Sequence, residues 1–197
     1  MPRRKEFQVE KALDSAMRLF WTRGYEATSL DDLQRATGLS RSSLYLAFGN
    51  KHELFLRCLG HYTAQVGGAL GVCASEPLPA PELLRRLFKT VLELTTVKGK
   101  SRGCFLGNTS LELGERDAAV RRRVHSGLAA VEGVFAQVLR QGLAKGEIAR
   151  RVKPNLAAQV LTSNLHGMLV MAKAGAEKAS LNALQEAALS SIPGRTQ

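Results

Sequence analysis

The stretch TSLDDLQRATGLSRSSLYLAFGNKHELF, residues 28–55, decides the fold of the N-terminal part of this chain. Ser29 followed by Asp32 is a capping-box pattern, which predicts the start of a short helix. Gly38 interrupts that helix, and Ser40 is placed to cap a second short helix. Two short helices joined by a glycine turn are typical of a helix-turn-helix.

The small core of this unit is also predicted by spacing. Leu33, Leu39 and Leu44 can meet between the two helices, and Ala36 is the small residue expected at their close contact. The second helix, residues 41–48, would then turn Leu44 inward and lie in the major groove of DNA.

The side chains expected to face DNA have the chemistry that bases and phosphates require. Arginine bonds guanine edges in pairs, serine serves base or phosphate, and tyrosine offers a hydroxyl to a phosphate and a ring to a thymine methyl group. Free N–H groups at a helix start favour a phosphate beside Lys51 or Ser29, and basic residues before the first helix could form an arm along the backbone or minor groove. The candidate DNA-binding residues are Thr28, Ser29, Arg41, Ser42, Ser43, Tyr45, Lys51, Arg3 and Arg4.

A plain helical hairpin with a glycine turn would share part of this pattern, but the full run is more specific. It closely resembles the DNA-binding domain of the TetR/AcrR family of bacterial regulators, over about residues 6–60. Gln34 and Ala47 depart from the commonest pattern, and the short side chain at 47 removes one expected phosphate contact. The residues that carry the resemblance are Phe20, Gly24, Thr28, Leu33, Ala36, Gly38, Leu39, Ser40, Leu44, Tyr45, Phe48, Lys51 and Leu54.

Composition supports a nucleic-acid partner only weakly. The chain has 197 residues, 45% hydrophobic and 23% charged, with a net charge of +11. This balance predicts a globular protein whose partner is a polyanion. Residues 1–60, however, carry 10 basic and 7 acidic residues, so +8 of the excess belongs to the rest of the chain. The motif, and not the charge, therefore carries the DNA-binding prediction.

Compartment and cofactors follow from what the sequence lacks. The start MPRRKEF is not followed by an apolar run, so no signal peptide is expected. Three cysteines make no disulfide framework in a chain this long, which indicates a cytoplasmic protein. Cys58 and His61 have a metal-compatible spacing but no further ligand nearby, so neither metal nor cofactor is expected.

The rest of the chain has helical periodicity throughout, and no strand is expected. Helices are predicted from the cap at Asn50 to about Cys73, from Pro81, over 104–113, over 116–145, from Pro154 and from the cap at Ser180. The stretch 74–81 is read as a linker and 98–103 as a basic loop. The predicted fold class is all-α with about nine helices.

The family resemblance implies what these helices do. Residues 1–50 would form the helix-turn-helix DNA-binding domain, and residues 51–197 a ligand-binding and dimerisation domain. The protein would be a homodimeric repressor that binds a palindromic operator and is released by a small-molecule inducer. The last two helices would pair in a four-helix dimer interface, and their stripes could also serve the protomer core. The stripe residues are Leu156, Val160, Leu165, Leu169, Leu181, Leu184 and Ile192.

A candidate sensor lies in GCFLGNTSLEL, residues 103–113. Cys104 follows Lys98, Lys100 and Arg102 and lies at the start of a predicted helix, and both features lower a thiol pKa. It is a candidate redox or electrophile switch, with a small buried residue as the alternative. Possible inducer contacts are Cys104, Phe105, Asn108, Thr109, Phe88, Phe135, His166 and Met168.

Three other functions stay open at this point. An enzyme is disfavoured because no nucleophile elbow, P-loop, dinucleotide fingerprint or HExxH stretch is present. A general nucleoid-type DNA binder would not need the large apolar C-terminal part. A transcriptional activator would have the same DNA-binding motif as a repressor.

Overall fold

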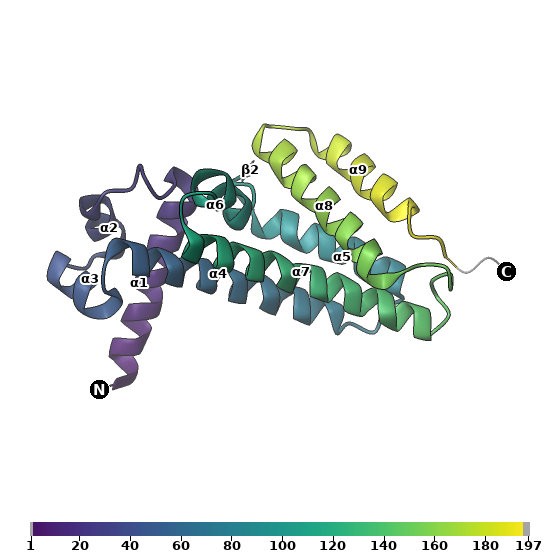
Figure 1. Ribbon diagram of the computed structural model, residues 1–197, viewed down its shortest axis with the longest axis horizontal. Coiled ribbons are helices and arrows are strands. Elements are labelled where there is room, and N and C mark those ends of the chain that lie inside the picture. The colour runs from purple at the N-terminus through teal and green to yellow at the C-terminus, as the bar shows by residue number, and fades with distance from the viewer. Residues whose placement is uncertain (1, 195–197) are drawn as a thin grey trace. The chain divides into compact units, whose positions relative to one another are not determined.

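The computed structural model describes the backbone of residues 2–194 and the side chains of residues 9–194. Over these residues the chain forms nine helices and one two-stranded hairpin, so the predicted all-α fold class is confirmed (Figure 1). The helices are α1 (Pro2–Arg23), α2 (Leu30–Thr37), α3 (Arg41–Phe48), α4 (Lys51–Ala74), α5 (Ala80–Leu94), α6 (Phe105–Leu113), α7 (Ala118–Ala144), α8 (Pro154–Lys173) and α9 (Lys178–Ser190). No described helix is long and apolar enough to cross a membrane.

The chain divides into two compact units. The first is Met1–Ala64 with Phe105–Gly127, and the second is Gln65–Cys104 with Leu128–Gln197. These units differ from a division of the chain at residue 50, because the first unit also contains the first half of α4, all of α6 and the start of α7. The assignment of functions to residues 1–50 and 51–197 stays a prediction.

An aromatic cluster forms the core of the first unit. On α1 the side chains of Ala12, Ala16 and Met17 are buried, and Phe20 near its end is 1% exposed. The ring of Phe20 meets that of Phe55 edge-on at 5.0 Å, and Trp21 meets Tyr62 at 5.0 Å. Phe105 from α6 lies against Trp21, Phe55 and Tyr62, which ties α6 into this core.

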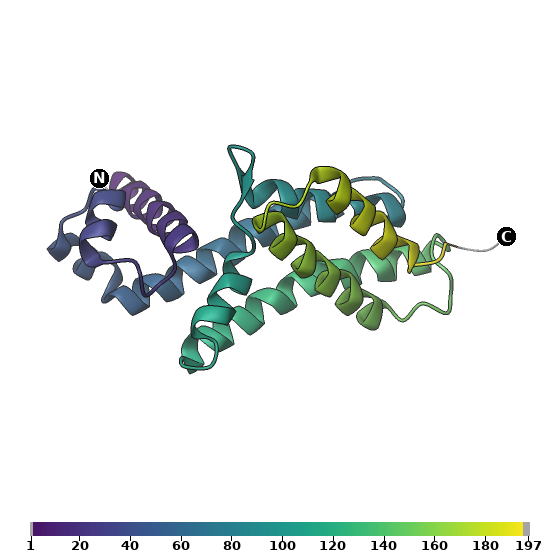
Figure 2. The same cartoon turned by 90° about the horizontal axis from the view of Figure 1, so that it is seen from above.

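The second unit is built from α5, α8, α9 and parts of α4 and α7. Helices α8 and α9 lie side by side and antiparallel (Figure 1 and Figure 2). Phe88 on α5 and Phe135 on α7 are fully buried and meet at right angles, 5.5 Å apart. An ion pair between Arg85 Nε and Glu186 Oε1, at 3.0 Å, joins α5 to α9.

Two local expectations were wrong. The basic loop contains a hairpin of β1 (Thr96–Val97) and β2 (Lys100–Ser101), which extends beyond the end of α5 (Figure 2). Lys98 and Gly99 both have positive φ, 50° and 76°, and this is the backbone of a tight hairpin turn. A β-branched pair before Lys-Gly was the available signal. Helix α9 begins at Lys178, after Glu177, and not at a Ser180 cap.

Candidate nucleic-acid interface

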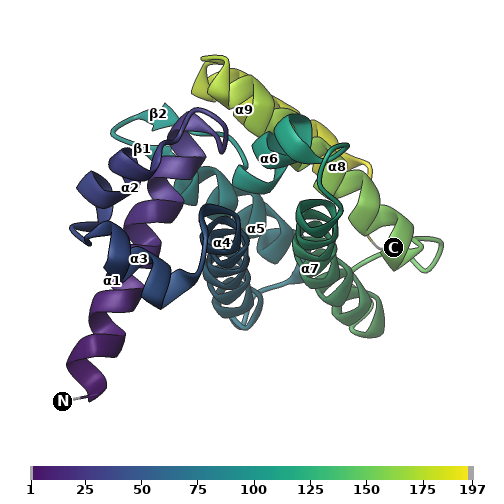
Figure 3. The same cartoon turned by 60° about the vertical axis from the view of Figure 1, so that its left-hand side comes forward.

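Short-range caps fix the two helices of the motif. Ser29 Oγ accepts from the Asp32 N–H at 3.1 Å, and the Asp32 carboxylate accepts from the Ser29 N–H at 3.0 Å. Ser40 caps α3 by accepting from the Ser43 N–H at 3.2 Å. The three cap bonds fix where α2 and α3 begin, while α2 packs against α1 and α3 packs against α2 (Figure 3). The predicted capping pattern is thereby confirmed.

The core between these helices differs from the prediction at one residue. Leu33 and Leu44 are buried and Leu39 is half-buried, as expected, but Ala36 is exposed. Thr37 is half-buried instead, and its hydroxyl donates to the Leu33 carbonyl at 2.7 Å and accepts from the Leu39 N–H at 3.2 Å. These bonds join Thr37 to its own helix and to the turn that follows, and the close contact expected at Ala36 is wrong because that residue is exposed.

The outer face of α3 is open to solvent. Ser42 and Ser43 are exposed, whereas Leu44 and Phe48 are buried on the other side of the helix. Arg41, the first residue of α3, is also exposed and lies at the edge of this face. The hydroxyls of Ser42 and Ser43 lie 3.0 Å and 2.9 Å from Ser40 Oγ. Small hydroxyl side chains let a helix approach a base edge closely and still offer hydrogen bonds.

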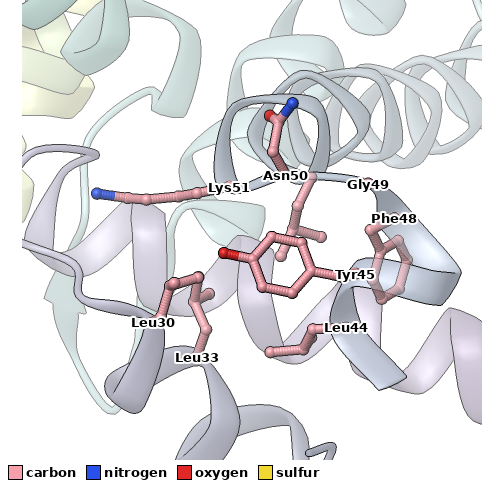
Figure 4. Close-up of a pocket in the computed structure, with 9 residues that line it drawn as sticks. Leu30, Leu33, Leu44, Tyr45, Phe48, Gly49, Asn50 and Lys51 are labelled. Atoms are coloured by element: carbon pink, nitrogen blue, oxygen red, sulfur yellow. The ribbon is translucent and has the colours of Figure 1, made fainter. Parts of the chain in front are cut away.

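Tyr45 lies at the flank of this face. It is 42% exposed and lines a shallow crevice, in which its ring lies near Leu30, Leu44 and Lys51 (Figure 4). The Arg41 guanidinium lies 5.8 Å from the centre of the Tyr45 ring. Arg41 and Tyr45 therefore form one edge of the surface, and each has a polar group for an external acceptor.

Lys51 opens α4 beside this edge. Its Nζ lies 4.3 Å from the centre of the Tyr25 ring, and a cation over an aromatic face is held by the negative face of the ring. The α4 cap expected from the sequence is present, since Asn50 Oδ1 accepts from the Glu53 N–H at 2.9 Å. Lys51 is thus positioned where α4 starts, next to the crevice of Tyr45.

The remaining DNA-binding candidates separate into three cases. Ser29 is exposed, but Thr28 is fully buried and its hydroxyl donates to the Gly24 carbonyl at 2.6 Å. This burial argues against a phosphate contact by Thr28. Arg3 and Arg4 lie in the first turn of α1, which begins at Pro2, and not in a separate arm. Their side chains lie outside the described residues.

Sequence reasoning missed a set of contacts that hold the motif from within its own unit. The Glu112 carboxylate of α6 accepts from the N–H groups of Tyr25 and Glu26, at 3.1 Å and 2.9 Å. It also lies where a side chain at Gly24 would be, and Gly24 has φ of +86°. The loop between α1 and α2 is therefore fixed by a residue more than eighty positions away.

A second contact joins α4 to the start of α7. His52 Nε2 lies 2.6 Å from Asp117 Oδ2, and Asp117 Oδ1 accepts from the N–H groups of Ala119 and Val120. The backbone bond from Val120, followed by the bond with His52, holds the pKa of Asp117 below its usual value despite partial desolvation. No short-range pattern in the sequence marks either pair.

The candidate sensor Cys104 lies in the second unit with a histidine partner. Cys104 and His166 are both half-buried. A hydrogen bond with the Cys104 side chain raises the pKa of His166, which burial alone would lower. His166 Nδ1 lies 2.6 Å from the Thr162 carbonyl oxygen. Because a carbonyl can only accept, Nδ1 donates, and Nε2 is left as the acceptor in the neutral ring.

The other inducer candidates fall in both units. Phe88, Phe135 and Met168 are buried in the second unit. Phe105, Asn108 and Thr109 belong to the first, where Phe105 and Thr109 are buried and Asn108 is half-buried. In the described structure the three phenylalanines act as core residues.

Two family models match this chain. A model described as bacterial regulatory proteins, tetR family, matches residues 12–58, and one described as tetracyclin repressor-like, C-terminal domain, matches residues 80–188. The chain belongs to the TetR family. This membership makes it a transcriptional regulator and not an enzyme.

Individual TetR-family relatives extend over most of the chain. The repressor ComR of Escherichia coli K12 is 34% identical over 177 residues, 88% of this chain and 83% of ComR. A cysteine mutant of CifR, solved with a 26bp double-strand operator DNA, is 30% identical with a TM-score of 0.79, covering 93% of this chain and 96% of CifR. A TetR regulator of Chloroflexus aurantiacus reaches a TM-score of 0.86 at 20% identity, covers 99% of this chain and 100% of that protein, and supports the fold alone.

Proposed function

We propose that this protein is a transcriptional repressor that binds a palindromic operator as a homodimer in the cytoplasm. The observation that carries this proposal is the open outer face of α3, where Arg41, Ser42 and Ser43 are exposed on a helix fixed by a cap at its start. ComR and BdcR, both named repressors, are 34% and 31% identical to the matching parts of this chain. The CifR mutant solved with operator DNA supports the choice of ligand.

Each residue of the surface has a role that its chemistry suits. Arg41 reads a guanine edge, and Ser42 and Ser43 contact bases or phosphates. Lys51 binds a phosphate at the start of α4, where the free N–H groups of the helix add to its charge. Tyr45 contacts the backbone with its hydroxyl from the flank of α3.

The dimer would form through the exposed stripe of α8, together with α9. Leu156, Val160 and Val170 are 57%, 41% and 64% exposed on one side of α8, and Gly167 lies between them with open space around it. Small and apolar side chains allow two helices to pack closely. Leu165 and Leu169 are buried within the protomer, so they contribute to its core and not to this stripe.

The segment 51–197 would then bind the inducer as well as the partner copy. Inducer and operator would oppose each other with a coupling on the order of 1–3 kcal/mol, because each favours a different state of the dimer. Glu112 of α6 binds the loop before α2, and Asp117 at the start of α7 binds His52 of α4, so α6 and α7 contact the segments that flank α2 and α3.

Selection from a pool of random-sequence duplexes tests this function. The expected result is an enriched palindrome, bound with an affinity that falls steeply as salt rises, because phosphate contacts release counterions. Enrichment of no sequence, with equal binding to every duplex, would instead identify a general DNA binder. Reporter expression from a promoter that carries the palindrome separates repression from activation.

Cys104 supports a second candidate, a regulator switched by an electrophile or oxidant. The observation that favours it is the hydrogen bond between Cys104 and His166. His166 Nε2 would take the thiol proton, and the thiolate would add to the double bond of an electrophile such as N-ethylmaleimide. The neighbouring carbon then gains a proton from the imidazolium, so that atoms and charge balance.

A mobility shift with N-ethylmaleimide and with hypochlorite tests this switch. Either reagent should release the parent protein from its operator and leave Cys104→Ser bound, while His166→Gln reacts more slowly with N-ethylmaleimide. Equal release of the parent and Cys104→Ser would rule the switch out.

A further inference from the structure

Leu46 is the feature of α3 that the proposed roles leave unexplained. Its side chain is 85% exposed, although α3 has only eight residues and two of its apolar side chains are fully used in the core. Leu46 lies two positions from Leu44 and two from Phe48. In a helix of 3.6 residues per turn this places it on the side opposite both buried residues.

Helical geometry places two serines beside Leu46 and two larger side chains on one flank. Ser42 lies one turn earlier on the same side, and Ser43 lies next to it. Arg41 and Tyr45 lie toward one flank, where the guanidinium contacts the tyrosine ring. The centre of the outer face is therefore a leucine preceded by two small hydroxyl residues, with the arginine at its edge.

We propose that Leu46 contacts the 5-methyl group of a thymine in the major groove, which makes thymine a required base in each half-site. This inference rests on the proposed operator binding and names the base at the centre of the readout. Leucine has no hydrogen-bonding atom, so it cannot read the donors and acceptors of a base edge. The thymine methyl group is the apolar group that the major groove presents.

The short side chains beside Leu46 favour this contact over a contact with the DNA backbone. Ser42 and Ser43 are too small to hold the helix away from the floor of the groove, so the longer leucine reaches the base edge first. A contact with a phosphate would leave the apolar surface of Leu46 facing a hydrated, charged group. That is unfavourable, because apolar surface is stabilised only when it is removed from water.

Uracil substitution in the DNA tests the contact, since uracil differs from thymine only by the methyl group. The probe is the palindromic duplex enriched by the parent protein, with each thymine replaced singly, in both half-sites, by deoxyuridine. At one position the parent should bind the uracil duplex about fourfold more weakly per half-site, which is the effect of losing one buried methyl group. Leu46→Ala should bind the thymine and uracil duplexes equally at that position.

Leu111→Ala is the matched control, because Leu111 on α6 is 87% exposed in the same unit. This variant should keep the full uracil sensitivity of the parent. Unchanged thermal melting of Leu46→Ala would show that the fold is intact. Uracil sensitivity that persists in Leu46→Ala, or a palindrome with no sensitive thymine, would overturn the contact while leaving the proposed function standing. If no duplex is enriched at all, the proposed function fails and the contact fails with it.

Discussion

The outer face of α3 and the exposed stripe of α8 share the same helical geometry but differ in chemistry. Both helices bury one side in their own unit and leave the other side open. On α3 the open side offers two serines and one leucine, with an arginine at its edge. On α8 it offers Leu156, Val160, Val170 and an open Gly167.

The difference between the two faces indicates what each can bind. DNA is recognised by charge, hydrogen bonds and single apolar contacts, which suits a polar face with one leucine. A second copy of the chain is recognised by close packing of apolar surface, which suits a stripe with a glycine at its centre. Changing one face at a time tests whether each serves its own partner.

The largest effect is expected from a charge on the α8 stripe. Gly167→Glu finds open space in the protomer and replaces a poor helix former, so the protomer should fold. If a second copy covers the stripe, the buried charge should produce monomers. Operator affinity should then fall by about 100-fold or more, because the two half-sites are no longer bound together. Sedimentation velocity and a mobility shift measure both effects.

Gly68→Glu is the control for this change, since Gly68 on α4 is also exposed with open space around it. It should remain dimeric. A Gly167→Glu protein that stays dimeric and binds normally would show that α8 is not the dimer face.

A smaller effect is expected from the α3 face. Arg41→Ala should weaken binding to the selected palindrome by roughly tenfold and relax the preference for one guanine, since a bidentate arginine–guanine contact contributes about 1–3 kcal/mol. Arg122, exposed on α7 in the same unit, provides the control Arg122→Ala. If both variants lose the same affinity on every duplex, Arg41 acts only through its charge.

The smallest effect concerns the contacts that hold the motif. Asp117→Ala should lower the free energy of unfolding by about 1 kcal/mol at neutral pH, as for loss of a helix cap. The folded pKa of Asp117 is lowered, so its stabilisation is present above the unfolded pKa of about 3.9 and is lost as pH falls through the folded value. The gap between parent and variant should therefore narrow below about pH 4.

Urea denaturation at several pH values measures this gap, with Glu115→Ala as the control because Glu115 is exposed nearby. A gap that stays constant into acid would mean that the carboxylate of Asp117 is not the source of the stability.

The sequence predicted the caps of the helix-turn-helix closely because their determinants are local. The caps at Ser29, Ser40 and Asn50 each involve residues three positions apart, so the pattern is visible in the chain. The contact expected at Ala36 was wrong because periodicity over eight residues resolves poorly which positions face inward. The burial of Thr28 follows from its bond to Gly24 and could not be read from its type.

The remaining contacts could not be predicted because they join distant residues. Glu112 and Tyr25 are 87 positions apart, and His52 and Asp117 are 65 apart. His166 was expected among the inducer contacts, but its bond to Cys104 depends on how α8 packs in the second unit. Leu46 was overlooked because an exposed leucine has no periodic signal of its own.

Competition between two duplexes tests directly whether the protein recognises a specific operator. The selected palindrome and a scrambled duplex of equal length and composition compete for the protein at physiological salt. A dimeric repressor of this operator should prefer the palindrome by about 1,000-fold or more, with two protomers on each bound duplex. Equal affinity for the two duplexes would contradict sequence-specific operator binding.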